Sequence, residues 1–227
     1  MSASVQAVIF DCDGTLVDSE GPAIDVIRTM VGELGIPLTL EQAHTHFLGV
    51  RMAECMRWIG SQLTDKPADF EATFMARVRQ ATEVRFHQGL QAMPGAAEIL
   101  SRLCVPFCVA TNGPREKVEL TLQLTGLRSY FGERIFCAYE TGFFKPDPGL
   151  FLHAARTLGI DPAHCAVVED SLPGIAAGLA AGMQVFSLYP VEQLPPDLLQ
   201  RITSIECLQR LEDHLPLLSS CKTGSSF

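Results

Sequence analysis

The chain has 227 residues, of which 47% are hydrophobic and 19% charged, and its formal net charge is −9. This is the composition of a globular protein long enough to bury a substantial core. The negative charge argues against a nucleic-acid partner, because clustered Lys and Arg lead that interaction. No window reaches the roughly 18 apolar residues of a membrane-spanning helix, and the first apolar stretch stops at Asp11, too soon for a signal peptide. We therefore expect a cytoplasmic protein with no membrane partner.

The 8 cysteines are scattered along the chain, several of them inside apolar runs, and no CxxC pair occurs. Zinc sites and disulfide frameworks have more regular cysteine spacing. The pattern therefore indicates reduced thiols packed in the interior.

The first strand is predicted at residues 5–10, where an apolar run ends in the motif DCDGT. In an extended chain Asp11 and Asp13 face the same side, because they are two residues apart. Ligands of open α/β sheets bind at the carboxyl ends of strands, and two carboxylates in one cleft repel unless a cation lies beside them. The pattern therefore predicts bound Mg²⁺, a hard ion that takes oxygen ligands. Gly14 and Thr15 provide the turn that leaves the strand.

No convincing strand occurs over residues 20–90, where apolar residues recur at helical spacing. Three such stripes predict three helices, and their members are Ile24, Ile27, Val31 and Leu34, then Met52, Met56 and Ile59, and then Phe70, Phe74 and Val78. We interpret this segment as a helical bundle inserted between the first strand and the rest of the chain.

Strands and helices alternate over residues 93–190. Near-continuous apolar runs predict strands at 105–110, 135–138, 165–168 and 184–188, as expected of strands that are covered on both faces. Helical spacing predicts a helix over about 114–124 and another that carries Leu150, Phe151, Ala154 and Leu158. This order predicts a doubly wound, Rossmann-like parallel sheet. The tail, 219–227, has a linker-like composition and is predicted to be mobile.

The second predicted strand is followed by Thr111, Asn112 and Gly113. A helix that begins near Pro114 would direct its free amides and the positive end of its dipole at the same sheet edge. A hydroxyl, an amide and a helix start together could hold a phosphate group.

Charged residues follow two further predicted strands. Lys145 lies in the motif KPDP, directly before a predicted helix, and would supply positive charge among the acids. Glu169 and Asp170 follow the strand at 165–168, and adjacent acids after a buried strand are costly without a cation. We therefore expect Glu169 and Asp170 to form the other half of the metal site.

The motifs DCDGT, TN, KPDP and VEDS, in this order and at strand ends, resemble those of the haloacid dehalogenase superfamily of aspartate-nucleophile hydrolases. The resemblance covers nearly the whole chain. It implies a Rossmann-like catalytic core at 1–17 and 92–218, with a helical C1-type cap inserted at 18–91. It also implies a phosphatase that acts on a small phosphorylated metabolite. The regions around DCDGTLVDSE, GVR, TNGP and KPDP are most similar to those of the bacterial 6-phosphogluconate phosphatases, so the expected substrate is a sugar or sugar-acid phosphate.

The resemblance implies a role for each motif. Asp11 would attack phosphorus and form an aspartyl-phosphate, and Asp13 would protonate the leaving group and later take a proton from water. The phosphoryl oxygens would be held by Thr111, Lys145 and the amide of Asn112 or Gly113.

The same resemblance implies a magnesium site and a residue of the cap that contacts the substrate. Mg²⁺ would be bound by Asp11, the backbone carbonyl of Asp13 and Asp170, with Glu169 either a ligand or a support for one. Arg51 would reach across from the cap to a carboxylate or a second phosphate, although an ordinary surface arginine is the alternative.

Three other classes of function stay open. A β-phosphoglucomutase-like phosphotransferase shares all four motifs. The pattern that those mutases resemble has a histidine, however, at the position where this chain has Ala23. A signalling receiver module also uses a phospho-accepting Asp, a Thr, a Lys and an acid pair, but in the reverse order and without a helical insertion. A purely structural protein would have no need of four acid or phosphate features at one sheet edge. Nothing in the sequence requires an assembly larger than a monomer.

Overall fold

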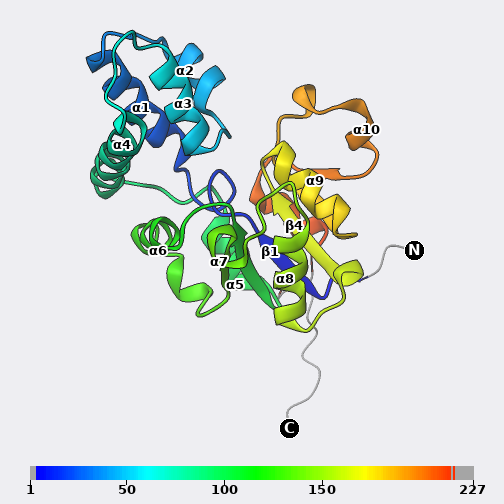
Figure 1. The fold of residues 1–227 in the computed structure, drawn as a ribbon. Helices are drawn as coiled ribbons and strands as arrows, with labels where there is room; N and C mark the ends of the chain where they lie inside the picture. The colour runs from blue at the N-terminus through cyan, green and yellow to red at the C-terminus, as the bar shows by residue number, and fades with distance from the viewer. Residues whose placement is uncertain (1–3, 216, 218–227) are drawn as a thin grey trace. The chain divides into compact units, whose positions relative to one another are not determined.

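Six parallel strands form one sheet in a computed structural model of the chain, which describes residues 4–215 and 217 (Figure 1). The order of the strands is β3-β2-β1-β4-β5-β6, as in doubly wound folds. The strands are β1 (Ala7–Phe10), β2 (Phe107–Thr111), β3 (Ile135–Cys137), β4 (Cys165–Glu169), β5 (Gln184–Ser187) and β6 (Thr203–Ser204). The predicted doubly wound, Rossmann-like fold is therefore confirmed.

Every residue of β1, β2, β3 and β4 is buried, which explains why their sequences are continuously apolar. The predicted strand boundaries differ from the observed ones by one or two residues. For example, β2 begins at Phe107 rather than at 105, because Pro106 has no amide hydrogen to donate to a strand ladder. The two-residue strand β6 was not predicted, since so short a run carries no periodicity.

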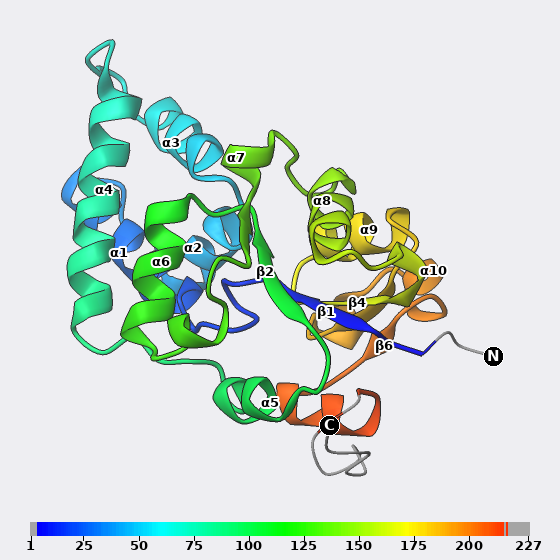
Figure 2. The same cartoon turned by 90° about the horizontal axis from the view of Figure 1, so that it is seen from below.

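Helices cover both faces of this sheet. Figure 2 shows α8 and α9 on one side, where they pack on β1 to β5, and α5 on the other side, where it contacts η4 (Leu208–Asp213). The helices of this part of the chain are α5 (Ala96–Arg102), α6 (Arg115–Leu124), α7 (Ala138–Thr141), α8 (Gly149–Leu158), α9 (Leu172–Ala180) and α10 (Pro196–Leu199), with short 3₁₀ turns at η1 (Arg128–Tyr130), η2 (Pro162–His164) and η3 (Val191–Gln193).

The chain divides into two compact units, one formed by Met1–Val17 with Ala92–Phe227 and the other by Asp18–Gln91. The second unit consists of four helices, α1 (Glu20–Glu33), α2 (Leu40–Phe47), α3 (Met52–Ser61) and α4 (Phe70–His87). The three predicted stripes lie on α1, α3 and α4 and contribute to one apolar core. Helix α2 was not predicted. Its sequence does contain a recognisable helix start, because Thr39 and Gln42 form a capping box.

The predicted mobile tail, 219–227, lies outside the described residues, as does Cys221. None of the seven cysteines within the described part of the chain forms a disulfide, and five of them are buried. In the same residues, no helix is both long enough and apolar enough to cross a membrane.

Candidate active site

Polar residues from three strands meet at the carboxyl edge of the sheet. Phe10, the last residue of β1, pairs with Val109 of β2 and with Val168 of β4. The next amide, that of Asp11, donates to the carbonyl of Val168 at 3.0 Å. This register brings Asp11 level with Glu169, the last residue of β4, in the middle of the sheet.

Lys145 is buried in this edge, with 3% of its side chain exposed. Its Nζ contacts Oδ1 of Asp11 and lies 2.5 Å from Oε1 of Glu169. The ammonium also lies 4.9 Å from the ring centroid of Phe151, which adds a cation–π contact. Burial alone would lower the pKa of Lys145, but the two carboxylates outweigh burial and raise that pKa above its ordinary value. Lys145 is therefore held as a cation between two acids.

The side chain of Asn112 fixes the backbone of Lys145. Its Oδ1 accepts from the amide of Lys145 at 2.9 Å, and its Nδ2 donates to the carbonyl of the same residue at 3.4 Å. The loop after β2 therefore holds the segment that carries the lysine.

One ammonium group faces two carboxylates here, so the buried cluster carries an excess of negative charge. Burial raises the pKa of Asp11 from its ordinary value of 3.8 to about 7, and the charges of Glu169 and Asp13 act in the same direction. Lys145 opposes this rise without abolishing it. A second cation would remove the imbalance.

Three carboxylates at this edge fit a divalent metal ion. Oxygen atoms of Asp11, Glu169 and Asp170 lie within 4.8 Å of one another. Gly14 has a φ of +74°, and a Cβ at that position would lie 2.0 Å from Oδ2 of Asp170. The absent side chain thus makes room for the carboxylate of Asp170, whose Oδ1 accepts from the hydroxyl of Thr15 at 2.9 Å. This all-oxygen donor set suits a hard ion such as Mg²⁺.

Glu169 has hydrogen-bond partners at both of its oxygens. Oε1 faces Lys145, and Oε2 accepts from the amides of Asp170 and Ser171, each at 3.1 Å, and from the Ser171 hydroxyl at 2.9 Å. Gly174 of α9 lies directly against this carboxylate. The sequence offered no sign of Gly174, which looks like an ordinary helix residue there.

Asp13 has a different lysine as its partner. Its Oδ2 lies 2.8 Å from the Nζ of Lys117, in the first turn of α6. Lys117 was not predicted as a site residue, because a lysine near the start of a helix resembles a solvated surface residue. Asp11 and Asp13 therefore differ in both burial and partner.

The remaining predicted residues have clear local partners. The hydroxyl of Thr111 is buried and accepts from the amide of Gly113 at 3.0 Å. Arg51 lies in the helical unit, where it precedes α3 and pairs with Glu54 at 2.6 Å, with 67% of its side chain exposed. The other predicted site residues, which are Asp11, Asp13, Thr111, Asn112, Gly113, Lys145, Glu169 and Asp170, all belong to the unit that contains the sheet.

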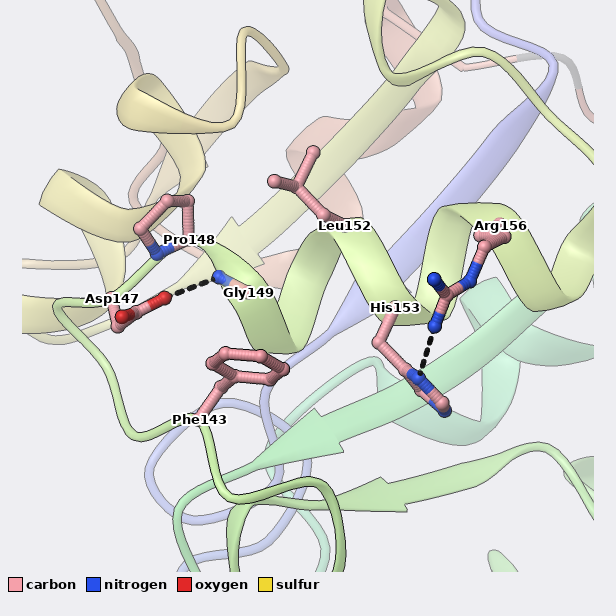
Figure 3. A pocket seen from close by; sticks show the side chains of 7 residues that line it. All are labelled: Phe143, Asp147, Pro148, Gly149, Leu152, His153 and Arg156. Atoms are coloured by element: carbon pink, nitrogen blue, oxygen red, sulfur yellow. Dashed lines mark hydrogen bonds between the residues drawn. The ribbon is translucent and has the colours of Figure 1, made fainter.

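A cavity of about 450 Å³ lies along α8 in the sheet-containing unit (Figure 3). Its lining residues are Phe143, Asp147, Pro148, Gly149, Leu152, His153 and Arg156, none of which is a predicted site residue. Asp147 accepts from the amide of Gly149 at 2.7 Å, and Arg156 lies 3.1 Å from Nδ1 of His153. The polar groups drawn there already bond to one another, so the acidic cluster is the better candidate for chemistry.

Known proteins resemble this chain in both sequence and fold. The model of the haloacid dehalogenase-like hydrolase family matches residues 5–182. The 6-phosphogluconate phosphatase of Escherichia coli K12 is 34% identical, over 92% of this chain and 94% of its own. The structure of a family hydrolase from Deinococcus radiodurans R1, solved with bound phosphate and sodium, is 33% identical and superimposes with a TM-score of 0.72 over 92% of this chain and 95% of its own. A Thermotoga maritima structure provisionally named a β-phosphoglucomutase is 26% identical, with a TM-score of 0.76 over 93% of this chain and 100% of its own.

Proposed function

Since the chain belongs to the haloacid dehalogenase-like hydrolase family, we propose that it is a Mg²⁺-dependent phosphatase that hydrolyses a sugar or sugar-acid phosphate through an aspartyl-phosphate. Phosphatase activity at the level of the family is supported by relatives that carry phosphatase names. The observation that carries the mechanism is the buried cluster of Asp11, Lys145 and Glu169, in which one cation faces two acids.

Asp11 is the nucleophile in this proposal. Its carboxylate attacks phosphorus, the bond between phosphorus and the substrate oxygen breaks, and Asp13 gives its proton to the departing alkoxide. In the second step Asp13 takes a proton from water, the water oxygen bonds to phosphorus, and the bond to Asp11 breaks. Asp13 is thereby protonated again, ready for the next substrate. The two aspartates differ in burial and in lysine partner, as two groups with different roles require, and a metal ion beside Asp11 would favour the ionised form that a nucleophile needs.

The phosphoryl group is held by Thr111, the backbone amide of Asn112 and Lys145. The Gly113 amide already donates to the Thr111 oxygen, so the hydroxyl proton of Thr111 can point to a phosphoryl oxygen instead. Gly113 itself thus acts by orienting the threonine. These groups act by position and charge, which is the main protein contribution to phosphoryl transfer.

Mg²⁺ would be held by Asp11, the backbone carbonyl of Asp13 and Asp170. Bound there, it would neutralise the charge that develops on the phosphoryl oxygens. Glu169 has both oxygens engaged by Lys145 and by the turn at Ser171, which supports a role in orienting the neighbouring acids rather than in binding the metal directly.

The helical unit, Asp18–Gln91, is proposed to be the cap that selects the substrate. Arg51 would bind the carboxylate of 6-phosphogluconate, the substrate named for the Escherichia coli relative. Its present partner, Glu54, would be exchanged at little cost, because exposed ion pairs contribute only about 0–1 kcal/mol.

The proposed activity is tested by measuring phosphate release from a panel of sugar and sugar-acid phosphates, with Mg²⁺ and with EDTA. We expect 6-phosphogluconate among the better substrates, loss of activity in EDTA and an inactive Asp11→Asn variant. An Asp11→Asn variant with wild-type turnover would exclude this mechanism.

A phosphotransferase is the second candidate, and the similarity to the Thermotoga maritima structure with a mutase name favours it. The alanine at position 23 argues against a phosphotransferase, because the mutase pattern has a histidine at that position. The two activities differ in the fate of the phosphate on Asp11. Transfer to an added sugar phosphate would identify a mutase, and release to water a phosphatase.

A further inference from the structure

Lys117 holds the carboxylate of Asp13 at the start of α6. The distance from its Nζ to Oδ2 of Asp13 is 2.8 Å, and the two side chains are 34% and 20% exposed. The same Oδ2 lies 3.5 Å from the point that a Cβ on Gly113 would occupy. Asp13 is therefore directed toward the loop and helix that directly follow Thr111, the last residue of β2.

The backbone around Asp13 is fixed by its own turn. The amides of Leu16 and Val17 both donate to the carbonyl of Cys12, at 2.9 and 3.0 Å, and the amide of Gly14 donates to the carbonyl of Val17 at 2.9 Å. With the main chain held in this way, the freedom left to Asp13 is rotation of its side chain. The contact with Lys117 restricts that rotation.

The two lysines of the site form ion pairs with different acids. Lys145 is 3% exposed and lies between Asp11 and Glu169, whereas Lys117 is more exposed and reaches Asp13 from another element. A group that transfers a proton must stay within hydrogen-bond reach of the reacting oxygen, and a displacement of 1 Å can cost on the order of 10²-fold in rate. An orienting contact on Asp13 thus has a direct kinetic consequence.

We propose that Lys117 is a positioning residue that keeps Asp13 oriented toward the leaving-group oxygen. This inference rests on the proposed phosphatase mechanism, in which Asp13 carries the proton. Lys117 acts through Asp13 and is not assigned a contact with the substrate.

Substrates with different leaving groups test the inference. An alkoxide needs a proton as it departs, whereas p-nitrophenolate, the anion of a far stronger acid, does not. The value of kcat/KM reports the first irreversible step, in which the leaving group departs. We expect Lys117→Ala to lower kcat/KM about 10-fold or more for the best alkyl phosphate of the panel, which is a part of the roughly 10²–10⁴-fold that acid–base catalysis contributes, and to leave kcat/KM for p-nitrophenyl phosphate unchanged. Lys117→Arg should restore most of the loss, because it keeps the cation.

A double-variant cycle separates positioning from substrate binding. In an Asp13→Asn background, Lys117→Ala should cause no further loss, since the group through which it acts is already gone. Glu116→Gln, which changes a charge on the neighbouring exposed residue of α6, should behave as wild type. Equal losses for both substrates, or losses that multiply in the double variant, would overturn the inference and leave the proposed phosphatase intact. A wild-type protein that releases phosphate from neither compound contradicts the proposed function itself.

Discussion

Gly174 and Glu169 fit together so closely that a Cβ at position 174 would lie 1.9 Å from the carboxyl carbon of the glutamate. Glu169 is fully buried at the end of β4, and Gly174 lies in the first turns of α9. The helix thus approaches the strand end only because residue 174 has no side chain. The position of Glu169, and through it that of Lys145, depends on this glycine.

Gly174→Ala is expected to displace Glu169 and to disturb the neighbouring acids. Partners of metal-binding residues typically contribute 10–100-fold to metal affinity, so the Mg²⁺ concentration for half-maximal activity should rise by about that factor. A magnesium titration of phosphatase activity measures it. Gly32→Ala is the matched control, because Gly32 lies in α1 and a Cβ added there would meet no atom within 4 Å. A variant at 174 with an unchanged magnesium requirement would contradict this role.

The raised pKa of Asp11 predicts a pH dependence of stability in the metal-free protein. Between the ordinary value of 3.8 and the folded value of about 7, the native state binds more protons than the unfolded state. The contribution of this group to the free energy of unfolding therefore falls as the pH rises through that range. Mg²⁺ competes with the proton, so its stabilising effect should grow over the same range.

Thermal unfolding with and without Mg²⁺, at about pH 5 and about pH 8, measures this coupling. We expect a larger rise in Tm at the higher pH, and a smaller difference between the two pH values in Asp11→Asn. An equal magnesium shift at both pH values would show that Asp11 is not linked to metal binding.

Asn112→Ala should make the backbone of Lys145 less firmly fixed, while the lysine side chain is kept. The variant loses two hydrogen bonds to the lysine backbone, each worth about 1 kcal/mol. Urea unfolding should detect the loss of stability, and inhibition by inorganic phosphate should weaken if Lys145 binds the phosphoryl group. If Asn112→Ala is destabilised but inorganic phosphate inhibits it as strongly as the wild type, Asn112 does not contribute to substrate binding.

Arg51→Ala should raise KM for 6-phosphogluconate and leave KM for p-nitrophenyl phosphate unchanged, because only the first compound offers a carboxylate. Arg57→Ala is a suitable control, since Arg57 lies on α3, the helix that Arg51 directly precedes, is 65% exposed and lies 3.9 Å from the same Glu54. Measurement of KM for both variants with both substrates would show whether Arg51 contributes to recognition of the carboxylate. If the two variants have the same KM for 6-phosphogluconate, Arg51 has no part in recognition.

The residues that follow the strands directly could be predicted from the sequence. Asp11, Glu169 and Asp170 come straight after buried apolar runs, and the carboxyl ends of parallel strands share one edge. Local sequence therefore carries enough information to place them near one another.

Other contacts depend on packing between distant segments. Asn112 and Lys145 are 33 residues apart, and their hydrogen bonds follow from how two loops meet. Lys117 and Gly174 lie within helices, where nothing in the local pattern distinguishes them from ordinary residues. Their roles follow only from the distances that the fold imposes.

In the proposed mechanism Asp11 carries the phosphoryl group. The direct measurement is to quench the enzyme with acid during turnover, reduce it with borohydride and sequence its peptides, because reduction converts an aspartyl-phosphate to homoserine. We expect homoserine at position 11, and none there in Asp11→Asn or in enzyme without substrate. Phosphate release that proceeds normally while position 11 stays aspartate would show that Asp11 is not the nucleophile.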